Sequence, residues 1–443
     1  DVRYISTGTL WKMGNMFQLS IELYDTKESK VLWLDRWQES WDNLTAIKGN
    51  LSDGLLKALD TKPKVEKKAD TSNPEAYEYY LKAKYKYEKR KNMEDTEIAR
   101  GLLQKAISLD DNLITAKIQL GWTYVEVGDY DKAMFIYEKA LKKSEELGDK
   151  SGVGLSLNDI GNVYYNKGDY DKALDFYSRS FEIREEIADK NGTGESLGSL
   201  GIVYSKKGDY DKALDYQTRS LEISEELDYK LGMGMSFYNL GSLYTSIGGY
   251  DKALDNCTRS HEIFEEISFK RGMGYSLNNI GINYFYKGDY DKALEHYTCS
   301  LEICEEISDK RGIGESLHNI GSIYHNKGDY DKVIKYFEKS LAIQKEIGYK
   351  GIELLTTTYL YLTYKNLGKA YNKQEINTLI KETENIEFEI NYRLYELLAD
   401  TNYLENAFKQ IQDIVDKLEP EIITNFLEFP IPKAIIQEWQ SES

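Results

Sequence analysis

Four histidines are the side chains best suited to hold a metal ion or to exchange protons near neutral pH: His261, His296, His318 and His325. His261-Glu262 looks like the start of a His-Glu-x-x-His zinc motif, but the second histidine is missing. His318 and His325 share one face of an expected helix, where two turns separate them by roughly 10 Å. That is too far for one ion to be shared without further ligands. We therefore predict no metal site and no cofactor.

The three cysteines, Cys257, Cys299 and Cys304, are too few and too unevenly spaced to form a disulfide framework. Cys299 and Cys304 are five residues apart and are expected to be small core or surface residues. Free thiols fit a reducing compartment, so a cytoplasmic location is expected.

Pairs of glycines could belong to a phosphate-binding loop, but none follows a strand and the third glycine of the dinucleotide fingerprint is absent. They recur every 40 residues, which favours a structural role: Gly152/Gly154, Gly192/Gly194, Gly232/Gly234, Gly272/Gly274 and Gly312/Gly314. Adjacent glutamates such as Glu185-Glu186 are not a catalytic pair, because nothing near them would desolvate one partner. We predict no intrinsic enzymatic activity for residues 1–443.

The charge balance narrows the kind of partner. The chain of 443 residues carries a net charge of −18, with 41% hydrophobic and 30% charged residues. An acidic surface repels phosphate backbones, so the basic stretch Lys82–Lys91 is expected to be a solvated helix face and not a nucleic-acid site. No apolar run is long enough to cross a bilayer, and no signal peptide is evident. A protein or peptide partner is expected, with basic segments favoured.

A period of 40 residues dominates the sequence. The turn Gly-Asp-Tyr-Asp-Lys begins at Gly128, Gly168, Gly208, Gly288 and Gly328, and its remaining copy reads Gly-Gly-Tyr from Gly248. A second glycine and a tyrosine three residues later recur in register, as in Gly161 and Tyr164. Six copies keep this spacing without an insertion.

Each copy is predicted to form two helices. The first ends at a glycine such as Gly168, which accepts the left-handed conformation, and the next begins at Asp169, which can cap it. Asp175 and Arg179 lie four apart as a favourable surface pair. The expected core positions are, in the first helix, Leu157, Ile160, Gly161 and Tyr164, and in the second, Ala173, Tyr177, Ser180, Ile183 and Ile187.

One helix pair cannot bury its apolar face alone, whereas stacked pairs form a superhelix with a continuous core. The small-large pattern Gly161, Tyr164, Ala173, Tyr177 resembles that of tetratricopeptide-repeat (TPR) proteins, over roughly residues 75 to 370. The units are similar to the 40-residue repeats of spindle-orientation adaptors, kinesin light chains and many bacterial signalling proteins. The resemblance implies a mainly α fold, a TPR α-solenoid forming a right-handed superhelix, which binds peptides or protein segments in its inner groove.

All five prolines lie outside the repeats, which suggests the domain limits. We expect a partial α/β unit at 1–60, a linker at 61–73, a divergent first repeat at 74–112, six repeats at 113–350, and a degenerate repeat with a helical cap at 351–443. In the α/β unit we expect three strands, Tyr4–Lys12, Met16–Tyr24 and Val31–Trp37, and a helix, Leu44–Leu59. Beyond the repeats we expect helices at Ile352–Leu367, Glu375–Phe388, Tyr392–Asp400 and Tyr403–Leu418.

The two ends carry a second resemblance. Residues 1–60 resemble the C-terminal half of a TolB-like domain, and the tail from Asn406 to Trp439 is similar to the C-terminal end of bacterial class III adenylate/guanylate cyclase proteins. This implies that the chain is a fragment of a longer protein and the regulatory or sensor part of a signalling enzyme. No cyclase catalytic motif is present.

The TPR resemblance also implies which residues line the groove. They are mostly amides, hydroxyls and aromatics, which can pair with an extended backbone and pack its side chains. They are Asn158, Asn162, Tyr165, Asn166, Ser205, Lys206, Tyr238, Ser242, Thr245, Asn278, Phe285, Tyr286, His318, Ser322, His325 and Asn326. The leading hypothesis is an interaction scaffold that grips a partner segment there. The alternatives are the regulatory part of a nucleotide cyclase and self-association through an exposed end of the solenoid.

Overall fold

The computed structural model describes residues 4–13, 16–25, 30–40, 73–88, 90, 93–347, 350–383, 386–416 and 420–442. The chain forms two compact units. The first comprises Asp1–Thr123 and Lys139–Gly152, and the second comprises Tyr124–Glu138 and Val153–Ser443.

The N-terminal strands of the first unit form one antiparallel sheet of order β1-β2-β3. Their bounds are Tyr4–Met13 for β1, Met16–Asp25 for β2 and Lys30–Ser40 for β3. Gly8 pairs with Ile21 in the first ladder, and the register shifts between Leu23 and Tyr24 in the second. The three predicted strands are therefore confirmed. The predicted helix Leu44–Leu59 lies outside the described residues.

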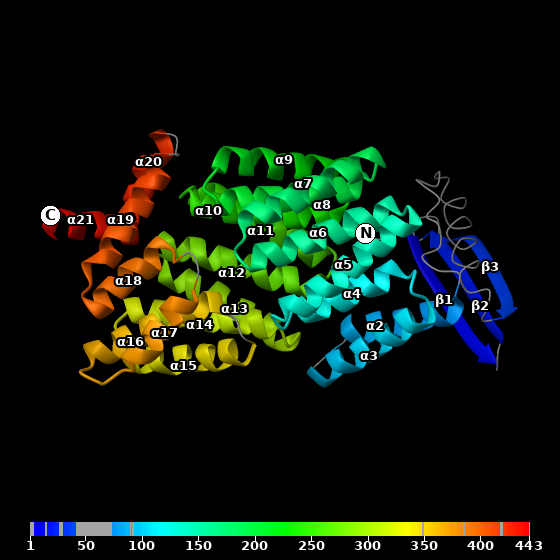
Figure 1. Cartoon of the computed structure of the whole chain (residues 1–443), viewed down its shortest axis with the longest axis horizontal. Coiled ribbons are helices and arrows are strands. Elements are labelled where there is room, and N and C mark those ends of the chain that lie inside the picture. The colour runs from blue at the N-terminus through cyan, green and yellow to red at the C-terminus, as the bar shows by residue number, and fades with distance from the viewer. Residues whose placement is uncertain are drawn as a thin grey trace. The chain divides into compact units, whose positions relative to one another are not determined.

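The remaining elements of the described chain are helices joined by short turns (Figure 1). They are α2 Pro74–Glu88, α3 Met93–Leu109, α4 Ile114–Val125, α5 Tyr130–Leu147, α6 Lys150–Asn166, α7 Tyr170–Glu186, α8 Lys190–Lys206, α9 Tyr210–Glu226, α10 Lys230–Ser246, α11 Tyr250–Glu266, α12 Lys270–Tyr286, α13 Tyr290–Glu306, α14 Lys310–Asn326, α15 Tyr330–Ile347, α16 Lys350–Asn366, α17 Lys373–Glu382, α18 Phe388–Leu398, α19 Thr401–Val415, α20 Pro420–Leu427 and α21 Pro430–Glu442. None of these helices combines the length and the apolar character needed to cross a membrane.

The 40-residue pattern produces helix pairs for local reasons that the sequence makes visible. Gly168 has φ +79° after α6, a conformation that glycine adopts without strain. The Asp169 carboxylate then accepts a hydrogen bond from the backbone N–H of Lys172 and caps α7. A Cβ on Gly161 would lie 2.7 Å from the ring of Tyr177, so a side chain larger than hydrogen would push the two helices apart.

The core of the repeats follows the prediction at most positions, but Tyr164 in the first helix is only partly buried. Leu157, Ile160, Ala173 and Tyr177 are buried. The second helix differs at its end, where Ile183 and Ile187 are only partly buried and the residue between them, Arg184, is 2% exposed.

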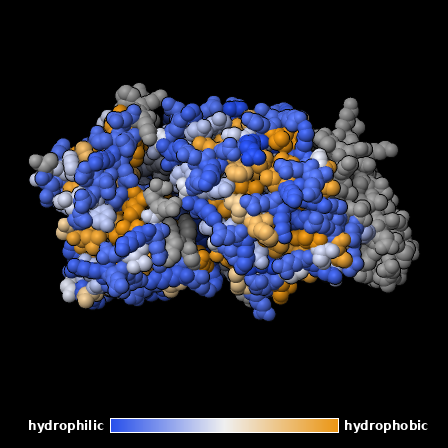
Figure 2. All heavy atoms as spheres, in the orientation of Figure 1, coloured by the Kyte–Doolittle hydropathy of each residue, from blue (hydrophilic) through white to orange (hydrophobic). Residues whose placement is uncertain are grey.

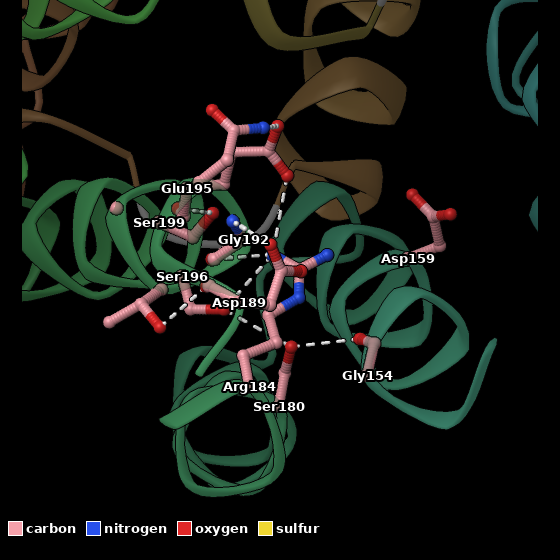
Figure 3. A network of polar contacts seen from close by, with 12 residues as sticks. Gly154, Asp159, Ser180, Arg184, Asp189, Gly192, Glu195, Ser196 and Ser199 are labelled. Carbon is pink, nitrogen blue, oxygen red and sulfur yellow. Dashed lines mark hydrogen bonds and ion pairs between the residues drawn. The ribbon is translucent and has the colours of Figure 1, made fainter. Parts of the chain in front are cut away.

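The glycine pairs lie where one repeat packs against the next, a contact that we call the seam between repeats. The hydroxyl of Ser180 donates to the carbonyl of Gly154 at 2.8 Å and lies 3.1 Å from the hydroxyl of Ser196 in the next repeat (Figure 3). The same contact recurs in four further copies: Ser220 with Gly194, Ser260 with Gly234, Ser300 with Gly274 and Ser340 with Gly314. The structural interpretation of these glycines is supported by the space around them, because a Cβ on Gly192 would lie 2.7 Å from the Arg184 side chain and one on Gly272 would lie 2.5 Å from the Phe264 ring.

Lysine–acid pairs tie consecutive repeats together on the surface. The lysine that precedes each turn glycine pairs with the aspartate at the start of the preceding repeat's second helix: Lys167–Asp131, Lys207–Asp171, Lys287–Asp251 and Lys327–Asp291. Two copies have an apolar residue at the lysine position, Val127 before Gly128 and Ile247 before Gly248.

The C-terminal helices differ from the prediction in one place. The predicted helix Glu375–Phe388 is wrong as one element, because α17 ends at Glu382 and α18 begins at Phe388. Thr383 takes an extended conformation, and its hydroxyl donates to the carbonyl of Leu379, which closes α17. Buried residues of α16, α17 and α18 pack in one core with Val333 and Phe337 of α15.

Candidate functional site

The first helices of successive pairs are joined by a line of side-chain hydrogen bonds. Asn279 donates to the hydroxyl of Ser242 at 2.7 Å, and Asn319 donates to the side-chain oxygen of Asn278 at 2.9 Å. His318 continues the line, with its Nδ1 2.9 Å from the Thr356 hydroxyl. Three predicted groove residues, Ser242, Asn278 and His318, therefore hold neighbouring repeats together.

Burial changes the chemistry of two predicted groove residues. His318 is 6% exposed, and burial lowers its pKa to about 4, so the ring is neutral at pH 7. Ser322 is also buried, 3.4 Å from the Nε2 of His318. These groups offer little to an incoming partner, because they already satisfy one another.

His325 lies on the same helix but faces the C-terminal segment. Its ring packs edge-on against Tyr359 at 5.2 Å, and burial together with Arg393 lowers its pKa to about 4. The Tyr359 hydroxyl donates to Glu389 at 2.8 Å and accepts from Arg393 at 3.2 Å. Among the described residues, no group of histidines, cysteines and acids is placed to hold a metal ion.

The predicted groove residues on α6 make their contacts within α6 and with α7 of the same repeat. The side-chain oxygen of Asn162 accepts from the Tyr177 hydroxyl at 2.7 Å, and its amide donates to Asp159. Tyr165 packs on Tyr170 with ring centroids 5.8 Å apart. Asn166 is exposed, whereas the side-chain oxygen of Asn158 is buried without a hydrogen bond within the described part of the chain.

The remaining predicted residues lie in different surroundings. The pKa of Tyr238 is raised, first by burial and then by Glu315. The ring of Phe285 packs against Tyr290 at 5.5 Å, and Asn326 is exposed.

The second unit contains a chamber of about 550 Å³ between the ends of α8, α10 and α12 and the C-terminal helices. This volume lies in the range typical of ligand pockets. The predicted residue Ser205 lines it, as do Lys206, Thr245 and Tyr286. The repeats also contribute Tyr170, Lys207, Gly208, Tyr210, Ser246, Tyr250 and Ile282; the C-terminal helices and their connections contribute Ile386, Glu387, Phe388, Glu389, Gln410, Asp413, Ile414, Phe426, Phe429, Ile431 and Pro432.

The chamber wall combines aromatic surface with one ion pair that joins its two sides. Lys206 Nζ lies 3.4 Å from Glu387, and this carboxylate raises the pKa of Lys206. Burial raises the pKa of Tyr170 and of Tyr210, which keeps both hydroxyls protonated at neutral pH. Such a wall can pack an aromatic or long aliphatic side chain and offers hydroxyl groups for hydrogen bonds.

The sequence did not reveal that the C-terminal helices supply half of this site. One signal was present in the turn from Gly248, where the repeat reads Gly-Gly-Tyr in place of Gly-Asp-Tyr. In the structure Tyr250 packs on Phe429 with ring centroids 4.3 Å apart. A Cβ on Gly248 would also meet the Phe429 ring, whereas Gly288 and Gly328 face open space.

A buried arginine is a further residue that the repeat pattern did not predict. Arg184 reaches from α7 to the start of α8, where Nη1 donates to the carbonyl of Gly192 at 2.7 Å and lies 3.2 Å from Glu195 (Figure 3). It belongs to the seam between repeats and not to the chamber. The face drawn in Figure 2 is largely hydrophilic, with hydrophobic side chains in separate patches.

Comparison with known proteins identifies the repeats. A family model described as tetratricopeptide repeat matches residues 153–226, 232–306 and 272–346, and a second model of the same description matches residues 114–144. No curated protein matches the chain.

Among solved structures, the chain resembles a Rap protein complexed with Competence and Sporulation Factor. The TM-score is 0.53 at 14% identity, over 83% of this chain and 100% of that one. It also matches a signal-transduction ATPase with a tetratricopeptide-repeat sensor from Pyrococcus horikoshii, with TM-score 0.49 and 17% identity over 83% of this chain and 53% of that one. BtubC from P. vanneervenii matches with TM-score 0.39 and 19% identity, over 53% of this chain and 92% of that one. At such identities the likeness to the Rap protein is one of fold. The helix pairs of residues 114–144, 153–226 and 232–346 are therefore tetratricopeptide repeats, and those of residues 153–346 stack as an α-solenoid within the second unit.

Proposed function

We propose that this chain is an interaction scaffold that binds a peptide or an extended protein segment along the inner faces of its repeats. The observation that carries the proposal is the chamber of about 550 Å³, which the inner residues Ser205, Lys206, Thr245 and Tyr286 line. These residues were expected at a groove from their repeat positions alone. The fold neighbour crystallised with Competence and Sporulation Factor supports the same class of activity.

The residues that line the chamber indicate which side chains of a partner can bind there. Its wall holds Tyr170 and Tyr210 from the repeats and apolar side chains such as Phe426 and Ile431 from the C-terminal helices. An aromatic or long aliphatic side chain of the partner fits this wall, because such anchors gain most from burial. The net charge of −18 favours partners whose flanking residues are basic.

Affinity capture from a lysate of the source cells tests this proposal. Three baits are compared: the unaltered chain, the chamber-filling variant Ser205→Phe, and the control Thr258→Phe on the exposed face of α11. We expect one protein to be retained by the unaltered chain and by Thr258→Phe and to be lost with Ser205→Phe. Equal recovery on all three baits would contradict binding at the chamber.

A further inference from the structure

The C-terminal helices pack on repeats far from them in sequence, through Tyr210 of one repeat and Tyr244 and Ile247 of the next. Buried residues of α19, α20 and α21 form an apolar cluster, the tail cluster, whose members include Leu404, Ile411, Phe426 and Ile435. Ile247, which follows α10, belongs to the same cluster and is 7% exposed. We call α19–α21 the tail.

The repeat that receives the tail departs from four other copies at the points of contact, and it also differs from the copy with Gly128, which keeps its aspartate at Asp129. The lysine that pairs with an aspartate in four other copies is Ile247 here, and Ile247 is buried in the tail cluster. The capping aspartate is replaced by Gly249, and α11 has no side-chain cap. Tyr250 is 8% exposed, and it stacks on Tyr286 and packs on Phe429.

A third departure affects the aromatic pair within the repeat. In four copies the tyrosine of the first helix stacks on a ring of the second: Tyr164–Phe176, Tyr204–Tyr216, Tyr284–His296 and Tyr324–Tyr336. Here the second ring is replaced by Asn256, whose amide donates to its own helix backbone, and Tyr244 packs against the tail cluster. This repeat therefore lacks the surface ion pair, the side-chain helix cap and the aromatic stack at the positions where it contacts the tail.

The tail and the repeats meet mainly through apolar and aromatic contacts. The ion pair Lys206–Glu387 lies at the chamber wall, at 3.4 Å, but Glu387 precedes α18 and is not part of the tail. Each tail helix is amphipathic, with buried positions such as Leu404, Ala407 and Ile411 on one side of α19. An amphipathic helix held on a hydrophobic surface is the arrangement by which helical ligands bind grooves.

We infer that the tail is a dissociable internal ligand of the repeats, docked on the surface Ile247–Tyr250, and that its docking closes the chamber. The docking of the tail on this surface does not depend on the proposed function. A role of the tail in controlling access of a partner does rest on the proposed function. A partner side chain can use the wall with the tail docked, whereas release of the tail would remove Phe426, Phe429 and Ile431 from this wall and open the repeat side to a longer partner segment.

Thiol labelling in the full chain tests the inference without any partner. Ser205→Cys places a reporter in the chamber, and native Cys299, which is exposed, serves as an internal control. With the tail docked, a bulky maleimide is expected to label position 205 at least tenfold more slowly than Cys299. Adding Phe429→Asp is expected to raise the rate at position 205 at least tenfold and to leave Cys299 unchanged.

A synthetic peptide of residues 401–442 then shows whether docking is specific. Added to the Phe429→Asp chain, it is expected to slow labelling at position 205 again. Ile247→Lys, which restores the lysine of the other repeats, is expected to open the chamber and to abolish protection by the peptide. Lys287→Ile makes the reverse exchange at the equivalent position of the next repeat and is expected to leave labelling unchanged.

Hydrogen exchange separates release of the tail from unfolding. Faster exchange in α19 and α21 with unchanged exchange in α10 and α12 supports a dissociable tail. Equal acceleration in the repeats, or labelling at position 205 that neither Phe429→Asp nor Ile247→Lys alters, would overturn the inference. Because no partner is used, these results are independent of the capture experiment.

Discussion

At the scale of single residues, Arg184 shows how one repeat departs from its neighbours at a buried position. The equivalent residues are neutral in the other copies: Ser144, Ser224, Phe264, Cys304 and Gln344. Arg184 is 2% exposed and donates to the carbonyl of Gly192. Its side chain fills the seam and satisfies a buried acceptor, which a smaller residue cannot do.

Arg184→Ala is expected to lower the free energy of unfolding by about 2–3 kcal/mol, because it leaves a cavity and an unpaired carbonyl. Arg179→Ala removes an exposed partner of Asp175 on the same helix and is expected to cost less than about 1 kcal/mol. Urea unfolding of the two variants measures the difference. Equal losses would show that Arg184 is not a structural element of the seam.

His318 makes stability depend on pH. Its pKa is about 4 in the fold, against an ordinary value of about 6.5 in the unfolded chain. As pH falls from about 6.5 to 4 the unfolded chain takes up a proton that the folded chain does not, so stability is lost in this window.

His318→Gln is expected to reduce that loss, because an amide can still bond Thr356 but does not titrate. The expected difference between the two chains is at most about 3 kcal/mol on going from pH 7 to pH 4. Melting temperatures of both chains across this range measure it. Melting temperatures that fall by the same amount in both chains between pH 7 and pH 4 would contradict the claim that His318 is buried and neutral.

At the scale of the element, the caps explain where the helices begin. Asp169, Asp209, Asp289 and others cap their helices with a carboxylate, whereas the helix after Gly249 has no side-chain cap. The starts after Asp169, Asp209 and Asp289 could be predicted from the sequence, since each of these three residues follows a turn glycine. The break after Glu382 could not, because it depends on Thr383 bonding backward to Leu379.

Asp169→Ala is therefore expected to destabilise the chain by about 1 kcal/mol through loss of a cap. Gly249→Ala occupies the same position in another repeat and removes no cap, and a Cβ there meets Tyr244 at an ordinary 3.4 Å. Its effect is expected to stay within about 0.5 kcal/mol. Chemical unfolding measures the free energy of unfolding of both variants. A larger loss of this free energy for Gly249→Ala than for Asp169→Ala would show that the side-chain cap is not what stabilises the helix start.

At the scale of the whole molecule, the repeat fold followed from the sequence and the site only partly did. The TPR resemblance implied that Ser205 and Tyr286 line a groove, and both line the chamber in the structure. It did not show that Ser242, Asn278 and His318 bond to neighbouring repeats. The tail was also missed, because its contact with Ile247 joins positions more than 150 residues apart, which no local pattern records.

The most direct test of the central claim is to find what touches the chamber in the source cells. A photo-crosslinking benzoylphenylalanine is placed at Ser205, and in a matched chain at Thr258 on the exposed face of α11. The account predicts a discrete protein or peptide adduct from position 205 that is absent from position 258. Adducts that are equal at both positions, or present only at 258, would contradict a partner bound along the inner faces of the repeats.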